Sequence, residues 1–223
     1  MVELRRDYHD RLAVLHERVR DIGGIVIEGV RDATRAVLSC DADLAAQVVA
    51  RDAAIDEVYP WVESEVFDIV ARQAPVARDL RFVIATFRIA ANIERCGDLV
   101  ASIARRADRL ERGALTPQVR ELLEEIGGAV ESAFDRAMAS YAVLDPDMAS
   151  TVSGLDVGID DLQRRLLRAM VSGGASDVES VIDLALVARF YERIGDHGVV
   201  IAERVRFVAL GEMDAGDRDN DFA

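Results

Sequence analysis

Apolar side chains recur every three or four residues along most of this chain, and this spacing restricts the possible folds more than any other feature. One apolar stripe runs from Leu15 to Val37 and a second from Met148 to Met170. Residues three and four apart share one face of an α-helix, and no convincing stretch shows the period of two expected of a strand. The sequence therefore predicts an all-α protein, with helices over residues 5–38, 42–73, 76–110, 117–143, 146–172 and 177–210.

Several of these helices begin at residues that favour helix starts. Thr116 and Asp145 each precede a proline, so the side chain is expected to cap the helix and the proline to take its first position. Ser176 and Glu179 have the spacing of a capping box. Pro60 lies inside the second predicted helix and is expected to kink it. Helices of about 40–55 Å, at a rise of roughly 1.5 Å per residue, suit long antiparallel bundles.

The second half of the chain repeats the first. The segment CDADLA at residue 40 matches LDPDMA at an offset of 104 positions, and ERCGDLVASIA at residue 94 matches ERIGDHGVVIA at an offset of 98. The smaller offset indicates a shorter hairpin before the last helix. The repeat predicts two tandem three-helix bundles related by internal pseudo-symmetry. We assign them to residues 1–112 and 113–211, followed by an acidic tail over residues 212–223 that is expected to be disordered.

Charge and composition argue against several classes of protein. The net charge of −14 at pH 7 disfavours a nucleic-acid binder, because phosphate contacts need clustered cations. No stretch reaches the roughly 18 apolar residues typical of a membrane span. The opening MVELRRDYHD has no apolar segment of a secretory signal, and two cysteines make no disulfide framework. These observations predict a reduced, cytoplasmic protein.

Paired acidic residues stand four positions apart inside apolar helical stretches, twice in each half. The pairs are Asp52 with Asp56, Glu94 with Asp98, Asp156 with Asp160, and Glu192 with Asp196. Residues four apart share a helix face, where like charges repel. If neighbouring helices bring the four acids of one half together, a cation is needed to offset that repulsion. Carboxylate oxygens suit iron, manganese, magnesium or calcium, and they also bind zinc.

An alternative pairing partner for the acids is a lattice of arginines. The candidates are Arg88, Arg95, Arg189 and Arg193, which lie near the acidic pairs in the sequence. His197 directly follows Asp196 and could add a nitrogen ligand in the second half only. The Glu-x-x-His pattern of di-iron bundle enzymes is missing from both halves.

Two further features of the sequence point to packing and away from catalysis. Gly23–Gly24 and Gly127–Gly128 lie inside helical pattern, where close approach of helices is the expected use. Cys96 lies between two acids that disfavour its thiolate, so we assign it to the core. Nothing in the sequence resembles a nucleophile with its base, and we expect no enzymatic activity.

The doubled ER-x-GD-x4-IA, the hairpin RQAPVARDLR at residues 72–81 and the Asp-x3-Asp pairs resemble the PhoU family of phosphate-transport accessory and regulatory proteins. The similarity covers about residues 8–208. It implies two pseudo-symmetric three-helix bundles whose E(D)-x-x-x-D motifs bind metal clusters, here Glu94 with Asp98 and Glu192 with Asp196. Pro60, the shortened second hairpin and the lack of lysine depart from the family pattern without removing an acidic position.

The resemblance implies a regulatory function. The expected protein links the ATPase subunit of an ATP-driven phosphate importer to a sensor histidine kinase, and it meets a membrane only through these partners. It restrains phosphate uptake and the phosphate-starvation response. The exposed faces of the bundles favour a homodimer. A metal-dependent enzyme, in which bridged cations activate water, is the alternative.

Overall fold

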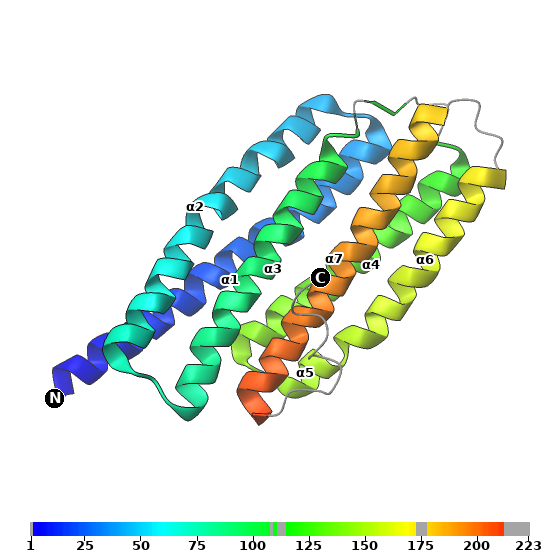
Figure 1. Cartoon of the computed structure of the whole chain (residues 1–223). Helices are drawn as coiled ribbons and strands as arrows, with labels where there is room; N and C mark the ends of the chain where they lie inside the picture. The colour runs from blue at the N-terminus through cyan, green and yellow to red at the C-terminus, as the bar shows by residue number, and fades with distance from the viewer. Residues whose placement is uncertain (1, 108, 111–114, 173–177, 212–223) are drawn as a thin grey trace.

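The computed structural model describes residues 2–107, 109–110, 115–172 and 178–211, and side chains from residue 6 onward within those ranges. All secondary structure in these ranges is helical, which confirms the all-α prediction (Figure 1). The helices are α1 (Val2–Ser39), α2 (Ala42–Gln73), α3 (Ala77–Ala104), α4 (Pro117–Val143), α5 (Pro146–Ser150), α6 (Val152–Ser172) and α7 (Val178–Leu210).

Two predicted helices were wrong in their extent. The helix predicted over 76–110 ends at Ala104, where the backbone tightens into three-residue turns such as Ala107 N to Ala104 O, at 2.9 Å. The apolar pattern continues past the end of the helix because Leu110 packs into the core although it is not helical, so the pattern predicted a helix that is too long. The helix predicted over 146–172 breaks at Thr151, whose hydroxyl donates to Met148 O at 2.7 Å. By contrast, α2 runs without a break through Pro60.

The predicted caps at Thr116 and Asp145 are confirmed. The Thr116 hydroxyl oxygen accepts from Val119 N at 3.3 Å, and an Asp145 carboxylate oxygen accepts from Met148 N at 3.1 Å. The capping box beginning at Ser176, the bundle boundary at residues 112 and 113, and the predicted tail over 212–223 involve positions outside the described residues.

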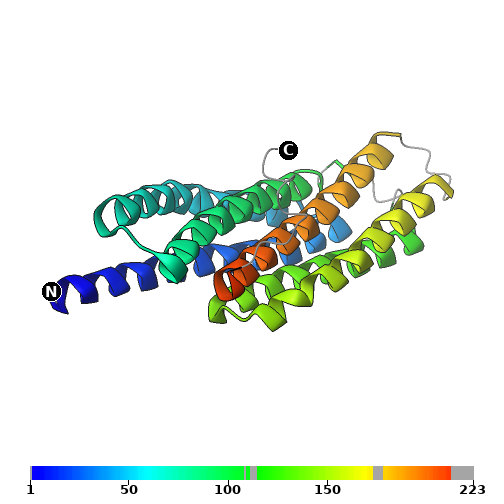
Figure 2. The same ribbon diagram turned by 60° about the horizontal axis from the view of Figure 1, so that its bottom comes forward.

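The helices form two three-helix bundles that pack along their length. Helices α1, α2 and α3 contact one another, and α4, α6 and α7 do the same with α5 beside them. The bundles meet where α1 contacts α4 and where α3 contacts α7, which runs antiparallel to it (Figures 1 and 2). Helices α2 and α6 therefore lie at the two outer sides of the molecule.

Position in the bundle decides how much of each predicted apolar stripe is buried. Leu15, Ile22 and Val30 of α1 are almost fully buried, because α1 contacts three other helices. The stripe predicted from Met148 to Met170 lies mostly in α6 and is only partly buried, with Leu155 41% exposed. An outer helix packs along a narrower face, which sequence periodicity alone does not reveal.

Two glycines allow α1 and α4 to approach each other at related positions. A Cβ atom on Gly127 would lie 2.4 Å from Thr34 Oγ1, and one on Gly23 would lie 2.3 Å from Met138 Cε. Gly23 and Gly127 are repeat equivalents, as are Thr34 and Met138, so the pseudo-symmetry extends to this contact. The prediction of close helix approach is confirmed for these two glycines.

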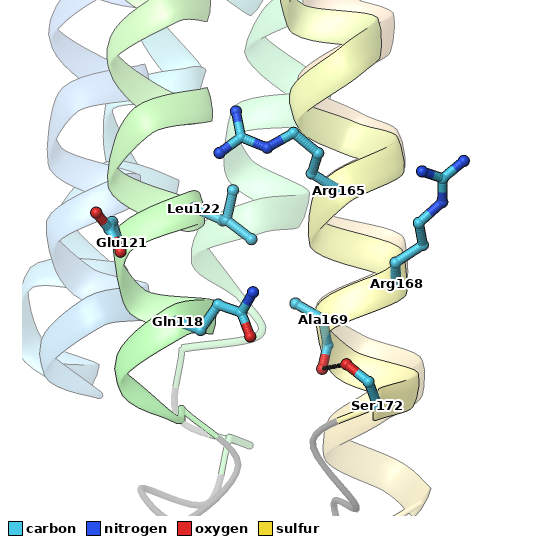
Figure 3. Close-up of a pocket in the computed structure, with 7 residues that line it drawn as sticks. All are labelled: Gln118, Glu121, Leu122, Arg165, Arg168, Ala169 and Ser172. Atoms are coloured by element: carbon cyan, nitrogen blue, oxygen red, sulfur yellow. Dashed lines mark hydrogen bonds between the residues drawn. The ribbon is translucent and has the colours of Figure 1, made fainter.

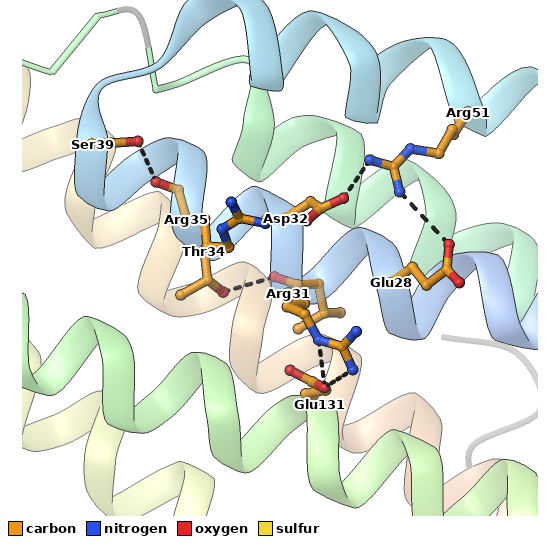
Figure 4. Close-up of polar contacts among 9 residues, drawn as sticks. Glu28, Arg31, Asp32, Thr34, Arg35, Ser39, Arg51 and Glu131 are labelled. Atoms are coloured by element: carbon orange, nitrogen blue, oxygen red, sulfur yellow. Dashed lines mark hydrogen bonds and ion pairs between the residues drawn. The ribbon is translucent and has the colours of Figure 1, made fainter.

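Polar contacts also join the bundles. Figure 4 shows Arg31 of α1 beside Glu131 of α4, with Nη2 and Oε1 2.5 Å apart. Arg31 is 55% exposed, so this ion pair contributes little to stability. In the interior, the Thr34 hydroxyl donates to Val30 O at 2.7 Å and lies 2.7 Å from the Tyr191 hydroxyl. The Tyr191 hydroxyl is therefore the donor in the second contact.

This donor order predicts unequal effects of two nearly isosteric substitutions. Thr34→Val leaves the buried Tyr191 hydroxyl without an acceptor and is expected to lower the free energy of unfolding by about 1–3 kcal/mol. Tyr191→Phe removes both the donor and its need for a partner, so we expect a loss of only about 0.5–1.5 kcal/mol. Urea unfolding of the two variants measures the difference. Equal losses, or a larger loss for Tyr191→Phe, would contradict the assigned donor.

Candidate metal centre

The predicted acidic residues of the first half lie where α2 and α3 run side by side. Asp52 is half-buried against Gly97 of α3, and a Cβ atom on that glycine would lie only 2.6 Å from Asp52 Oδ1. Asp156 of α6 has the same relation to Gly195 of α7, with the same distance of 2.6 Å. The glycine of each ER-x-GD motif therefore provides the space in which a carboxylate lies against the neighbouring helix.

The electrostatics show that the four acids of each half lie near one another. Burial, together with the negative charges of its three partners, raises the pKa of Asp52 to about 6. Burial likewise raises the pKa of Asp156 to about 6, again with contributions from its three partners. These partners are the predicted ones: Asp56, Glu94 and Asp98 in the first cluster, and Asp160, Glu192 and Asp196 in the second.

Each cluster is half-buried on one side and open to solvent on the other. Asp52 and Glu94 are partly buried, whereas Asp56 and Asp98 are exposed, and the second cluster repeats these exposures position by position. Burial also raises the pKa of Glu94. A cation from solution can therefore reach the acids from the outer side.

The acidic side chains have the right chemistry to bind a cation, but they would have to change conformation to reach a single ion. Asp156 Oδ1 and Glu192 Oε2 are buried and have no hydrogen-bond partner, and a cation would satisfy both. Within the described ranges, however, no three histidine, cysteine or acidic side chains stand close enough to hold one ion. Binding therefore requires the carboxylates of a cluster to turn toward one another, which the exposed side chains can do by changing rotamer.

The alternative of an arginine lattice is realised in part. Arg189 Nη1 forms an ion pair with Glu192 Oε1 on the same helix. The positive charge of Arg193 lowers the pKa of Asp196, and that of Arg95 lowers the pKa of Glu94. In both cases burial raises the pKa by more. The second cluster thus has one direct arginine contact that sequence reasoning had proposed.

The position of His197 argues against the nitrogen ligand proposed for the second cluster. Its Nδ1 lies 2.8 Å from Asn92 Oδ1, across the contact between α7 and α3. Burial lowers the pKa of His197 to about 4, so the ring is neutral and Nδ1 donates to the amide oxygen. Adjacent residues on a helix point in different directions, so His197 faces the first bundle and not the acidic cluster that contains Asp196. Its hydrogen bond to Asn92 joins the two bundles.

Two clefts lie apart from the acidic clusters. One, of about 300 Å³ between α4 and α6, is shown in Figure 3 and is lined in part by Leu122, Arg165 and Ser172. Glu121 of α4 also lines it, and Arg165 Nη1 lies 3.6 Å from Glu125 Oε2. The other, of about 450 Å³, lies between α1 and α4 beside Gly24. Neither cleft contains a predicted site residue.

Both halves of the chain, residues 19–107 and 123–205, match the family model described as the PhoU domain. The chain belongs to the PhoU family. It is 34% identical over 212 residues to the phosphate-specific transport system accessory protein PhoU homolog 2 of Mycobacterium tuberculosis, a match that covers 93% of this chain and 99% of that protein. The repeat and the resemblance identified in the sequence are thereby confirmed.

Solved PhoU structures have the same fold. The crystal structure of PhoU from Pseudomonas aeruginosa is 30% identical, with a TM-score of 0.86 over 92% of this chain and 100% of that one. The phosphate transport system regulatory protein PhoU from Streptococcus pneumoniae has a TM-score of 0.84 over 92% of this chain and 98% of that one, and at 23% identity it supports the fold alone. In the described part of this PhoU chain, no helix is both long and apolar enough to cross a membrane.

Proposed function

We propose that this PhoU protein regulates phosphate uptake and phosphate-starvation signalling as an adaptor without enzymatic activity. It binds the ATPase subunit of the phosphate importer and a sensor histidine kinase, and it acts in the cytoplasm as a homodimer. Membership of the PhoU family and the names of its relatives, accessory proteins of the phosphate-specific transport system, support this assignment.

The observation that carries the proposal is the duplicated carboxylate cluster. Two sets of four acids occupy equivalent places beside equivalent glycines, and burial together with the charges of the neighbouring acids raises the pKa of the half-buried aspartate in each set to about 6. A fold gains nothing from such repulsion in the absence of a positive charge. We therefore assign metal ions to both clusters, held by Asp52, Asp56, Glu94, Asp98, Asp156, Asp160, Glu192 and Asp196.

A bound ion, such as iron, zinc, manganese or magnesium, would supply positive charge on the open side of each cluster. The acids would hold α2 against α3 and α6 against α7, so the outer helices would be fixed relative to the central ones. In this proposal the fixed helices form the surface that the partners recognise.

Binding of the partners is expected to depend on the acidic clusters. A pull-down of the importer ATPase and the histidine kinase by the full chain should succeed with Mn²⁺ and weaken at least tenfold for Glu94→Gln/Asp98→Asn, about 1.4 kcal/mol. The matched control is Glu57→Gln/Glu63→Gln, which removes two exposed charges from α2 outside the cluster.

Three results would count against the proposal. Failure of the native chain to bind either partner would refute the adaptor role. If the cluster variant and its control bind the partners equally well, partner binding does not depend on the metal sites. Steady phosphoester turnover that disappears in Asp98→Ala would favour the metal-dependent enzyme instead.

A further inference from the structure

We propose that Arg189 serves as a built-in cation at the second carboxylate cluster, so that the two clusters bind metal with unequal affinity and the first cluster fills first. This inference rests on the proposed metal binding and assigns a specific residue as the cause of the inequality. Arg189 is a positioning residue for Glu192 and would not itself contact the metal.

The internal repeat shows a difference beside the glutamate of each motif. Arg189 stands three residues before Glu192, and the equivalent position before Glu94 is Ala91. The acids themselves are the same in type and in exposure in both clusters. Arg95 and Arg193 are equivalent to each other, so they do not distinguish the halves.

The contact made by Arg189 covers a ligand atom. Its guanidinium pairs with Glu192 Oε1, and the Glu192 side chain is only 13% exposed. The charge of Arg189 also acts on Asp196, so one arginine affects two of the four acids. The interactions that shift the pKa of Glu94 in the first cluster include no hydrogen bond, and the equivalent Ala91 has no charge to offer.

The first cluster has a nearby cation of its own, but it acts differently. Arg105, at the end of α3, affects Asp52 through its charge alone, and the equivalent residue in the second half is Glu203. Because no hydrogen bond has to be broken, a metal ion entering the first cluster displaces nothing. In the second cluster the ion must first displace a guanidinium that is 56% exposed and can swing into solvent.

The consequence is ordered loading. Displacing the guanidinium gives up its charge-assisted hydrogen bond to Glu192, and losing such a bond weakens metal binding about tenfold. The first cluster is then occupied at low cation concentration, and the second responds over a higher range. When metal is scarce, the positive charge of Arg189 partly offsets the repulsion among the acids of the second cluster, and the first cluster has no equivalent contact.

Mn²⁺ titration calorimetry on the full chain tests the inference in two backgrounds. Glu192→Gln/Asp196→Asn leaves only the first cluster intact, and Glu94→Gln/Asp98→Asn leaves only the second. We expect the first-cluster protein to bind Mn²⁺ about tenfold more tightly. Adding Arg189→Ala to the second-cluster protein should remove most of that difference.

The repeat supplies the reciprocal variant. Ala91→Arg in the first-cluster protein should weaken Mn²⁺ binding about tenfold, whereas Ala91→Gln, similar in length but neutral, should not. Circular dichroism melting verifies that each variant is folded, since Ala91 is half-buried. Unchanged Mn²⁺ affinity in Arg189→Ala would overturn the role of Arg189 and leave the metal sites standing. Absence of Mn²⁺ binding in both backgrounds would overturn the metal proposal itself, and this inference with it.

Discussion

Replacing Gly127 by alanine is expected to lower the free energy of unfolding by about 2–4 kcal/mol. The new Cβ would lie 2.4 Å from Thr34 Oγ1 and 2.6 Å from its Cγ2, in a fully packed contact between α4 and α1. Threonine branches at Cβ, so its side chain cannot move aside unless the helices separate. Separation would also break the buried hydrogen bond between Thr34 and Tyr191, 2.7 Å in length.

The neighbouring glycine provides a matched control. A Cβ on Gly128 meets nothing within 4 Å. Gly128→Ala should therefore stabilise α4 by about 0.5–1 kcal/mol through helix propensity alone. Gly23→Ala should be milder than Gly127→Ala, because the atom it meets is the flexible end of Met138. Urea unfolding separates the cases, and similar effects for Gly127→Ala and Gly128→Ala would show that the two bundles do not pack as described.

The double variant Asp52→Asn/Asp156→Asn is expected to be more stable than the native chain at pH 7.5 in a chelator, by about 1–2 kcal/mol after allowance for solvent screening. Both aspartates have a pKa raised to about 6, chiefly by burial. At pH 7.5 they are ionised in places that disfavour the charge. Asparagine has nearly the same shape and carries no charge, so the variant avoids this cost.

The advantage of the variant should shrink at pH 5. A carboxyl with a raised pKa contributes stability that is fully present below its unfolded pKa and is lost as the pH rises through its folded pKa. For these aspartates the window extends from about pH 4 to about pH 6. His197 acts in the opposite direction, because its pKa is lowered to about 4. The comparison must therefore be between variant and native chain at each pH, in which the histidine contribution cancels.

Saturating Mn²⁺ should reverse the order of stability. The native chain gains the free energy of metal binding, about 2.7 kcal/mol per site at a hundredfold excess over the dissociation constant, and the variant loses much of it. Chemical unfolding of both proteins at pH 5 and 7.5, with chelator and with Mn²⁺, gives the comparison under all four conditions. A variant that is no more stable than the native chain at pH 7.5 in chelator would contradict the electrostatic account of the clusters.

The candidate site illustrates how far local sequence rules reach. The eight acids could be identified because helix periodicity places residues four apart on one face, and because the repeat showed that the pairs were not isolated. Gly97 stands directly before Asp98, and Gly195 stands directly before Asp196. This repeated position could have identified the two glycines as part of the site. Their role depends on how closely α3 approaches α2, and α7 approaches α6, which no single-helix pattern encodes.

The amino-acid sequence by itself determined the helices, their caps and the twofold repetition, because these depend on interactions between residues close along the chain. Only the tertiary structure decided that Leu155 stays exposed on an outer helix and that α3 stops at Ala104. It likewise directed His197 of α7 to Asn92 of α3, whereas the pairing of Arg189 with Glu192, three residues apart on one helix, is local. The tertiary outcomes depend on which neighbour each helix face meets, and that neighbour is supplied by distant segments whose packing and charge outweigh local preference.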